Sequence, residues 1–344
     1  MKLDRRRFLA TSATALTAGG FLTSCFEKSD EGKSTDGAKE NPFQISLAQW
    51  SLHKALKAGE LDNLDYPAFT RDTFGLTAIE WVNQFFFVED PKLGYQPKDQ
   101  AYLAEMKKRC DDKGIKSVLI MCDRVGNLGD PDAAKRTAAV EGHFAWLDAA
   151  KFLGCHSIRV NAASDASRSP EEQADLCTEG LRRLSEHAAP MGLGVIVENH
   201  GGLSSNGAWL AQVIKNVGLA NCGTLPDFGN FYVAKNRGDA AKWESEKALY
   251  TGDPAYTEDA TGLGYDRYLG TKELMPYAKG VSAKAHDFDE AGNEIHTDFK
   301  KMMQIVKDAG YKGHVGIEYE GSGLGEVEGI KKTIALLERT FAAV

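Results

Sequence analysis

Acidic and imidazole side chains stand where four mainly apolar runs of this 344-residue chain end. They are Glu198, Asp227, His286 and Glu318. If the runs are neighbouring parallel strands, their carboxyl ends meet at one edge and these side chains converge on one centre. Three buried carboxylates repel one another unless a cation lies between them. We therefore expect one divalent metal ion (Mn²⁺, Mg²⁺, Co²⁺ or Zn²⁺) with oxygen ligands from the three acids and a nitrogen from His286, rather than four separate salt bridges.

A repeating unit supplies the strands. Helical stretches end in a glycine suited to a left-handed C-terminal position, and a short β-branched run follows each of them. These glycines are Gly75, Gly114, Gly154, Gly192, Gly218 and Gly310. The predicted strands are 45–50, 77–82, 116–121, 157–162, 194–198, 222–227, 280–285 and 314–319. Eight alternating strand–helix units favour an α/β fold with a closed parallel sheet, a (β/α)8 TIM barrel, over an open doubly wound sheet.

The segment from Lys235 to Thr271 is longer than a strand–helix connection needs and is rich in aromatic residues. Its rings belong to Trp243, Tyr250, Tyr256, Tyr265 and Tyr268. Such an insertion would lie at the carboxyl end of the barrel, where active sites are found. It suits either a lid that stacks on a sugar or a surface excursion that packs on itself.

The first 42 residues carry features of export rather than of a folded domain. Residues 5–9, Arg-Arg-Arg-Phe-Leu, and the weakly apolar stretch to Leu22 resemble a twin-arginine signal. The run 22–25, Leu-Thr-Ser-Cys, resembles a lipobox, which predicts a lipid on Cys25. We expect a signal over residues 1–25, a flexible linker over 26–42 and a catalytic barrel over 43–344, in a periplasmic or outer-membrane lipoprotein of a Gram-negative bacterium.

Charge and cysteine content narrow the class of partner. The net charge is −8, whereas proteins that bind nucleic acid usually carry a basic surface. None of the six cysteines forms a C-x-x-C pair, so a zinc ribbon or a thioredoxin-type site is not indicated. We expect buried, unpaired cysteines, a small-molecule substrate, no nucleic acid, and membrane contact only through Cys25. A homo-oligomer is compatible with the sequence.

Four motifs resemble those of the xylose-isomerase-like barrel superfamily, of the sugar phosphate isomerase/epimerase type. They are Val197-Glu198-Asn199-His200, Pro226-Asp227-Phe228-Gly229-Asn230, Ala283-Lys284-Ala285-His286-Asp287 and Gly316-Ile317-Glu318-Tyr319-Glu320-Gly321. The resemblance runs from about residue 43 to the C-terminus. It implies one metal ion held by Glu, Asp, His and Glu, and a sugar that chelates the ion. The family histidine usually precedes an aspartate by three residues, which places Lys284 in its position. Residues 284 and 286 share strand parity, and we predict His286 as the ligand.

The resemblance also implies a mechanism through an enediolate. Glu198 and Glu318 would remove and return a proton beside the sugar carbonyl, and Lys284 would polarise the carbonyl oxygen or stabilise the enediolate. Return to the neighbouring carbon gives an isomerase, and return to the other face of the same carbon gives an epimerase. Residues predicted to contact substrate or support the site are Trp50, His53, Glu80, Arg159, Asn161, His200 and Asn230.

Three other functions compete with isomerisation. A zinc endonuclease of related fold needs further histidines, where this chain has Asn230 and the run Asp287-Phe288-Asp289. A metal-dependent dehydratase or lyase acting on keto-sugars or inososes would use the same enediolate and lose a β-hydroxyl. A sugar-binding lipoprotein without activity would not need the four predicted ligands. We favour the isomerase or epimerase and keep the lyase as its main alternative.

Overall fold

A computed structural model describes residues 43–235, 238, 240–248, 250 and 252–344. These residues belong to the compact unit Asn41–Val344. The predicted signal, the linker and the lipid-bearing Cys25 lie outside the described residues and stay predictions. Among the described helices, none combines the length and apolar character that crossing a bilayer requires. The five described cysteines are buried and unpaired, as predicted.

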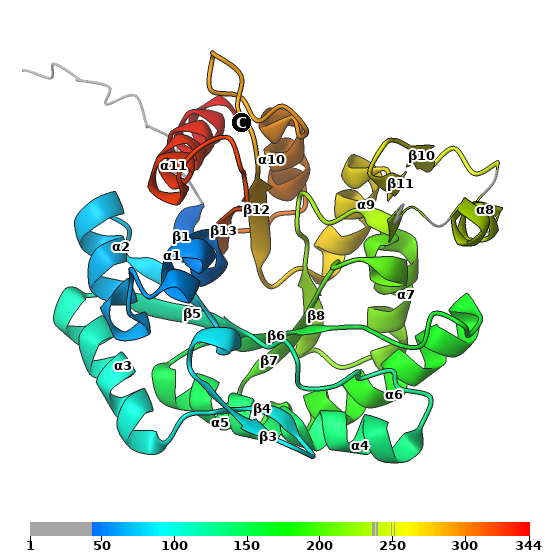
Figure 1. Ribbon diagram of the computed structural model, residues 1–344, viewed down its shortest axis with the longest axis horizontal. Helices are drawn as coiled ribbons and strands as arrows, with labels where there is room; N and C mark the ends of the chain where they lie inside the picture. Colours follow the sequence, from blue (N-terminus) through cyan, green and yellow to red (C-terminus); the bar gives the residue numbers. More distant parts are fainter. Residues whose placement is uncertain (1–42, 236–237, 239, 249, 251) are drawn as a thin grey trace, which may run out of the picture. The chain divides into compact units, whose positions relative to one another are not determined.

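Eight parallel strands form one curled sheet in the order β12-β13-β1-β2-β5-β6-β7-β8 (Figure 1). Their bounds are β1 Gln44–Ala48, β2 Ala78–Val82, β5 Lys116–Met121, β6 Ser157–Asn161, β7 Gly194–Glu198, β8 Cys222–Leu225, β12 Val281–Ala285 and β13 His314–Tyr319. The edge strands β8 and β12 meet through isolated parallel bridges, Thr224–Ala278 and Asp227–Ser282. This seam closes the ring, so the predicted (β/α)8 barrel is confirmed.

Helices cover the outside of the barrel (Figure 1). Their bounds are α1 His53–Ala58, α2 Tyr66–Phe74, α3 Gln100–Lys113, α4 Ala133–Gly142, α5 Phe144–Leu153, α6 Pro170–Ala188, α7 Gly207–Val217, α8 Ala240–Ala248, α9 Arg267–Leu274, α10 Phe299–Asp308 and α11 Glu326–Ala343. All six predicted helix-ending glycines have φ between 61° and 81°, the left-handed region that glycine adopts without strain. Side-chain caps begin several helices, as when Asp99 accepts the Tyr102 N–H at the start of α3.

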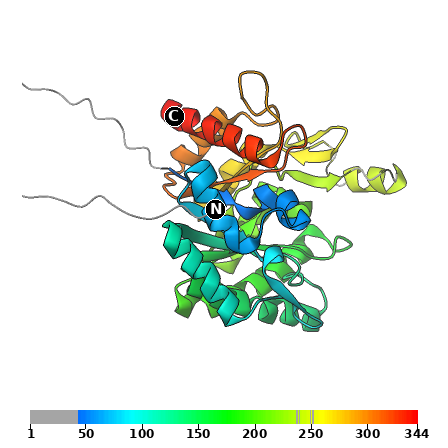
Figure 2. The same ribbon diagram turned by 60° about the vertical axis from the view of Figure 1, so that its left-hand side comes forward.

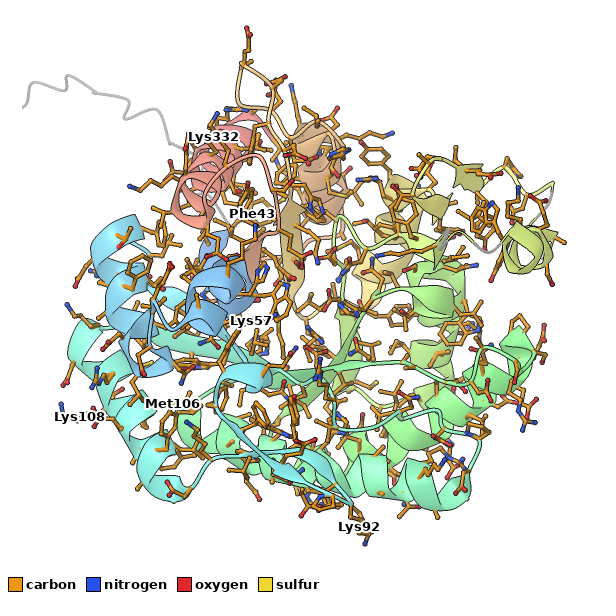
Figure 3. The ribbon with its side chains drawn as sticks, in the orientation of Figure 1. Phe43, Lys57, Lys92, Met106, Lys108 and Lys332 are labelled. Atoms are coloured by element: carbon orange, nitrogen blue, oxygen red, sulfur yellow. The ribbon has the colours of Figure 1, made fainter. Side chains whose placement is uncertain are left out.

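The main core lies between the barrel and its helices. Met106 of α3 is fully buried there, whereas Lys108 on the other side of the same helix points outward (Figure 3). Helices α10 and α11 pack beside each other, and α11 lies against β13 (Figure 2). Phe43 joins this side through its ring contact with Phe341, at 5.1 Å between centroids. A smaller, separate apolar cluster contains strand residues such as Val82, the last residue of β2.

Two antiparallel additions follow barrel strands. After β2, β3 (Phe87–Asp90) pairs with β4 (Gly94–Pro97). After β8, the aromatic insertion forms a three-stranded sheet from β9 (Tyr232–Lys235), β10 (Tyr256–Glu258) and β11 (Gly262–Tyr265), in the order β10-β11-β9. The insertion has its own buried cluster of Phe231, Val233, Trp243, Leu263 and Tyr265. The insertion therefore packs in part on itself, and its role as a lid that stacks on a sugar stays a prediction.

Candidate metal centre

Three buried carboxylates meet at the carboxyl end of the barrel. Glu198 ends β7, Asp227 lies two residues beyond β8, and Glu318 lies in β13. One ligand atom from each lies within 4.8 Å of the others, and the residues are 0, 0 and 3% exposed. We call this group the carboxylate trio. Its members come from strands far apart in the sequence, so the barrel alone brings them together.

Glu198 is held on both carboxylate oxygens. The Nε atom of Arg159 lies 2.8 Å from Oε2, and the side-chain amide of Asn230 donates to Oε1 at 2.8 Å. Arg159 reaches Glu198 from β6, whose Asn161 is the register partner of Glu198 on β7. Because Arg159 is itself buried, this ion pair is shielded from water. Arg159 Nε and Glu198 Oε2 are close without the geometry of a hydrogen bond, so the Asn230 hydrogen bond is the contact that orients the Glu198 carboxylate.

Asp227 is oriented by its own loop and by β12. Its Oδ1 accepts the backbone N–H groups of Gly229 (2.9 Å) and Asn230 (2.8 Å), and its Oδ2 accepts the Ser282 hydroxyl at 2.6 Å. The Asn199 side chain accepts the Asp227 N–H at 2.7 Å and donates to the Asp227 carbonyl at 3.0 Å. Burial and the nearby Glu198 raise the pKa of Asp227, while Lys284 opposes this shift.

Lys284 is the cation closest to Glu318. The two residues are register partners on β12 and β13, and Lys284 Nζ lies 3.1 Å from Glu318 Oε1. The same ammonium lies 3.1 Å from Glu320 Oε1 and 3.9 Å from Asp227 Oδ2. Burial raises the pKa of Glu318 well above its ordinary value despite Lys284. Burial also acts against ionisation of Glu320, but Lys284 outweighs it and lowers the pKa of Glu320 to about 2.

The charges of the site fit a divalent cation. Five carboxylates share two cations, Arg159 and Lys284, so the fully ionised site retains three uncompensated negative charges. The carboxylates are those of Asp123, Glu198, Asp227, Glu318 and Glu320. Burying such an excess is costly without a further positive charge, as the raised pKa values of Asp227 and Glu318 indicate. Three carboxylates are also the hard oxygen donors that Mg²⁺ and Mn²⁺ prefer.

His286 is not part of the carboxylate trio. It follows the last residue of β12 and is only half-buried, and its ring centroid lies 6.2 Å from that of His296. Among the described residues, the ligand atoms that lie within 4.8 Å of one another are those of the trio alone. The residue that β12 brings to the trio is Lys284, which occupies the position of the family histidine. The assignment of His286 as a metal ligand stays a prediction.

Asp123 is a site residue that the sequence argument missed. Its Oδ1 accepts Arg159 Nη1 at 2.8 Å and Asn161 Nδ2 at 2.9 Å, and its Oδ2 accepts Gln84 Nε2 at 3.2 Å. Burial acts to raise the pKa of Asp123, but Arg159 outweighs it and the pKa is lowered. Asp123 stands two residues beyond β5. It therefore shares its position with Asp227, which also stands two residues beyond the end of its strand.

The remaining predicted residues differ in burial and in their partners. Glu80 is buried inside the barrel, where it accepts the Ser46 hydroxyl at 2.6 Å and where burial raises its pKa to about 7. The rings of Trp50 and His53 stack at 4.8 Å, and Lys57 Nζ lies 4.2 Å from the Trp50 ring. His200, two residues beyond Glu198, is exposed.

Similar proteins include enzymes of several reaction types. The structure of 3-keto-D-glucoside 4-epimerase from E. coli has a TM-score of 0.58 and 15% identity, covering 81% of this chain and 94% of that one. The probable 3-DHS dehydratase from Bacillus anthracis has a TM-score of 0.55 and 14% identity, covering 86% and 99%. A 75-residue stretch is 33% identical to the C-glycoside deglycosidase alpha subunit of Arthrobacter globiformis, but it spans only 21% of that subunit and 20% of this chain.

The two structures share the barrel fold with this chain at identities too low to transfer an activity. The family model described as xylose isomerase-like TIM barrel matches residues 71–340, which include every residue of the carboxylate trio. The match therefore spans most of the barrel and all of its candidate metal centre. The chain belongs to the xylose isomerase-like TIM barrel family.

Proposed function

We propose that this protein is a divalent-metal-dependent isomerase or epimerase of keto- or aldo-sugars. One observation carries the proposal: a buried carboxylate trio with uncompensated negative charge lies at the carboxyl end of a barrel of this family. Glu198, Asp227 and Glu318 would hold the ion, with His286 as the fourth predicted ligand. A bound divalent cation would supply Lewis-acid polarisation of the sugar carbonyl.

The residues of the chain suit proton transfer beside a carbonyl. Glu198 and Glu318 approach the centre from β7 and β13, so a sugar between them would meet a carboxylate on either side. One would abstract the proton of the C–H next to the carbonyl, and the other would return a proton. Lys284, beside Glu318, would place an ammonium near the developing negative charge on oxygen. Asn230 would keep the Glu198 carboxylate in one orientation, with Arg159 as its counter-ion.

Similar proteins support a sugar substrate and indicate a keto-sugar. The E. coli neighbour is a 3-keto-D-glucoside 4-epimerase, which rearranges a sugar that carries a carbonyl group. The 33% match to a C-glycoside deglycosidase subunit and the dehydratase neighbour favour a second candidate, a lyase that expels a β-substituent after the same proton abstraction. The two candidates differ only in the fate of the enediolate.

The test combines metal content with proton exchange. Full-length protein loaded with Mn²⁺ is expected to retain one ion per chain, and Glu198→Gln, Asp227→Asn and Glu318→Gln are expected to lose it. In D₂O, a keto-sugar should gain deuterium at the carbon beside its carbonyl, which NMR detects. An epimer or isomer as the product supports the main proposal, and an unsaturated product with a released group supports the lyase. Absence of metal and of exchange would contradict both.

We also propose that the protein is exported and anchored by a lipid at Cys25, in the periplasm or on the outer membrane. The twin-arginine-like run and the lipobox-like run support this proposal. The expected result is incorporation of labelled palmitate into the wild type and its loss in Cys25→Ser. Labelling that persists in the variant, or protein retained in the cytoplasm, would contradict it.

A further inference from the structure

The Lys284 ammonium competes for the oxygens that a metal ion would use. Its Nζ atom lies within 4 Å of two trio members, Glu318 and Asp227, and the residue is only 3% exposed. Two cations that share the same carboxylates repel each other, and the repulsion is strong where water is excluded. A divalent ion in the trio therefore requires Lys284 to withdraw, or binds against a penalty.

Glu320 offers Lys284 a place outside the trio. It follows Glu318 by two residues, its Oε1 already lies 3.1 Å from Lys284 Nζ, and its side chain is 28% exposed. A lysine has a flexible four-carbon stem, so its ammonium can change partners without movement of the backbone.

The stem of Lys284 packs closely against the backbone of Gly229. A Cβ atom at Gly229 would lie 2.9 Å from Cδ and 3.1 Å from Cγ of Lys284, closer than normal contact. Gly229 also donates its N–H to Asp227. Gly229 therefore has two roles. Its N–H helps to orient Asp227, and its lack of a side chain leaves room for the stem of Lys284.

We propose that Lys284 is an exchangeable internal cation of the metal centre. It balances part of the negative charge of the carboxylate trio when the metal is absent and shifts towards Glu320 when a divalent ion binds. Lys284 then weakens metal affinity, and Glu320 limits that weakening because it accepts the displaced ammonium. This inference rests on the metal site of the proposed function and adds a control of its affinity.

The test is a double-mutant cycle on Mn²⁺ binding, measured by isothermal titration calorimetry on the full-length protein. Lys284→Met is expected to bind Mn²⁺ about tenfold more tightly than the wild type, and Glu320→Gln about tenfold more weakly, which is the coupling expected between neighbouring charges. The double variant is expected to behave like Lys284→Met, because Glu320 acts only through the lysine. Lys284→Gln serves as a second neutral variant should Lys284→Met fail to fold.

Two matched controls change the same charges elsewhere. Lys279→Met removes a lysine just before β12, at the other end of the barrel, and Glu328→Gln removes an exposed acid of α11. Neither is expected to alter Mn²⁺ affinity. A second readout is the thermal midpoint: Mn²⁺ should raise it more in Lys284→Met than in the wild type.

Each result separates the inference from the function on which it rests. If the wild type binds Mn²⁺ and neutral variants of Lys284 bind it no more tightly, the exchange is wrong and the metal site stands. If only the Lys284 variants bind, the lysine is a permanent substitute for the ion, and both proposals fail. If none binds, both fail as well. A Glu320→Gln effect that persists in the double variant overturns the role given to Glu320.

Discussion

The two sides of the site balance their charges differently. On the β5–β7 side, Arg159 lies between Asp123 and Glu198 at 2.8 Å from each, and the pKa of Asp123 is lowered. On the β8–β13 side, Lys284 alone serves Asp227, Glu318 and Glu320, and the pKa values of the first two are raised. On the arginine side, Arg159 pairs with both carboxylates, so their charges are partly balanced without a metal ion. On the lysine side, one ammonium faces three carboxylates. A divalent ion would therefore balance the most negative charge on that side.

The largest effect is expected from Glu318→Gln, on the lysine side. We expect loss of the bound divalent ion, together with a fall of about 10³-fold in kcat/KM because a proton-transfer group is removed. Metal analysis and turnover of a keto-sugar measure the two effects. Asp123→Asn, on the arginine side, should retain the ion. Equal loss of the ion in both variants would remove the distinction between the sides.

Of the two cations of the site, Arg159 should be the one whose removal destabilises the folded protein more. Arg159→Met leaves Asp123 and Glu198 buried without a counter-ion, which costs about 3–5 kcal/mol in the free energy of unfolding. Urea unfolding of the metal-free protein, followed by circular dichroism, measures this. Lys284→Met should cost less, because Asp227 and Glu318 can take up protons. A cost as large as that of Arg159→Met would contradict the comparison.

Glu80, which lies inside the barrel near Arg159, should make the stability of the protein depend on pH. Its pKa is about 7 in the folded protein although Arg159 acts to lower it, against about 4.3 in an unfolded chain. Between these values the folded protein holds a proton that the unfolded chain has lost. The free energy of unfolding of the metal-free protein should therefore fall as pH rises through this range, by up to about 4 kcal/mol. Urea midpoints at pH 5 and pH 8 should differ less in Glu80→Gln than in the wild type.

The smallest effect concerns substrate binding on the arginine side. Asn161 donates to Asp123, but its buried Oδ1 has no hydrogen-bond partner among the described residues. We expect this oxygen to accept a sugar hydroxyl, so Asn161→Ala should raise KM about fivefold, the scale of one neutral hydrogen bond, with kcat little changed. Steady-state kinetics with the identified sugar tests this. A fall in kcat alone would instead give Asn161 a role in orienting Asp123.

Local patterns predicted the barrel because six of the eight units are marked twice, by a helix-ending glycine and by a β-branched run. Gly114 followed by Lys116–Met121 is one such unit, and the structure has β5 with those bounds. The trio followed from the same logic, since strand ends on one edge must converge. The fourth position did not, because Lys284 and His286 share parity and differ only in depth along β12. Asp123 was missed because it lies beyond the predicted strand 116–121, whereas the predicted strand 222–227 includes Asp227.

The seam between β8 and β12, which closes the barrel, includes a residue of the candidate metal centre. β8 and β12 flank the longest insertion and are joined by two bridges, one of which pairs Asp227 with Ser282. The Ser282 hydroxyl also bonds the Asp227 carboxylate, so the weakest joint of the ring passes through the candidate metal centre. A metal ion in the centre would then hold β8 and β12 together and stabilise the closed barrel. The backbone amide of Phe228 donates to the Ser282 carbonyl across the seam. Its hydrogen should exchange with solvent more slowly when a divalent ion is bound.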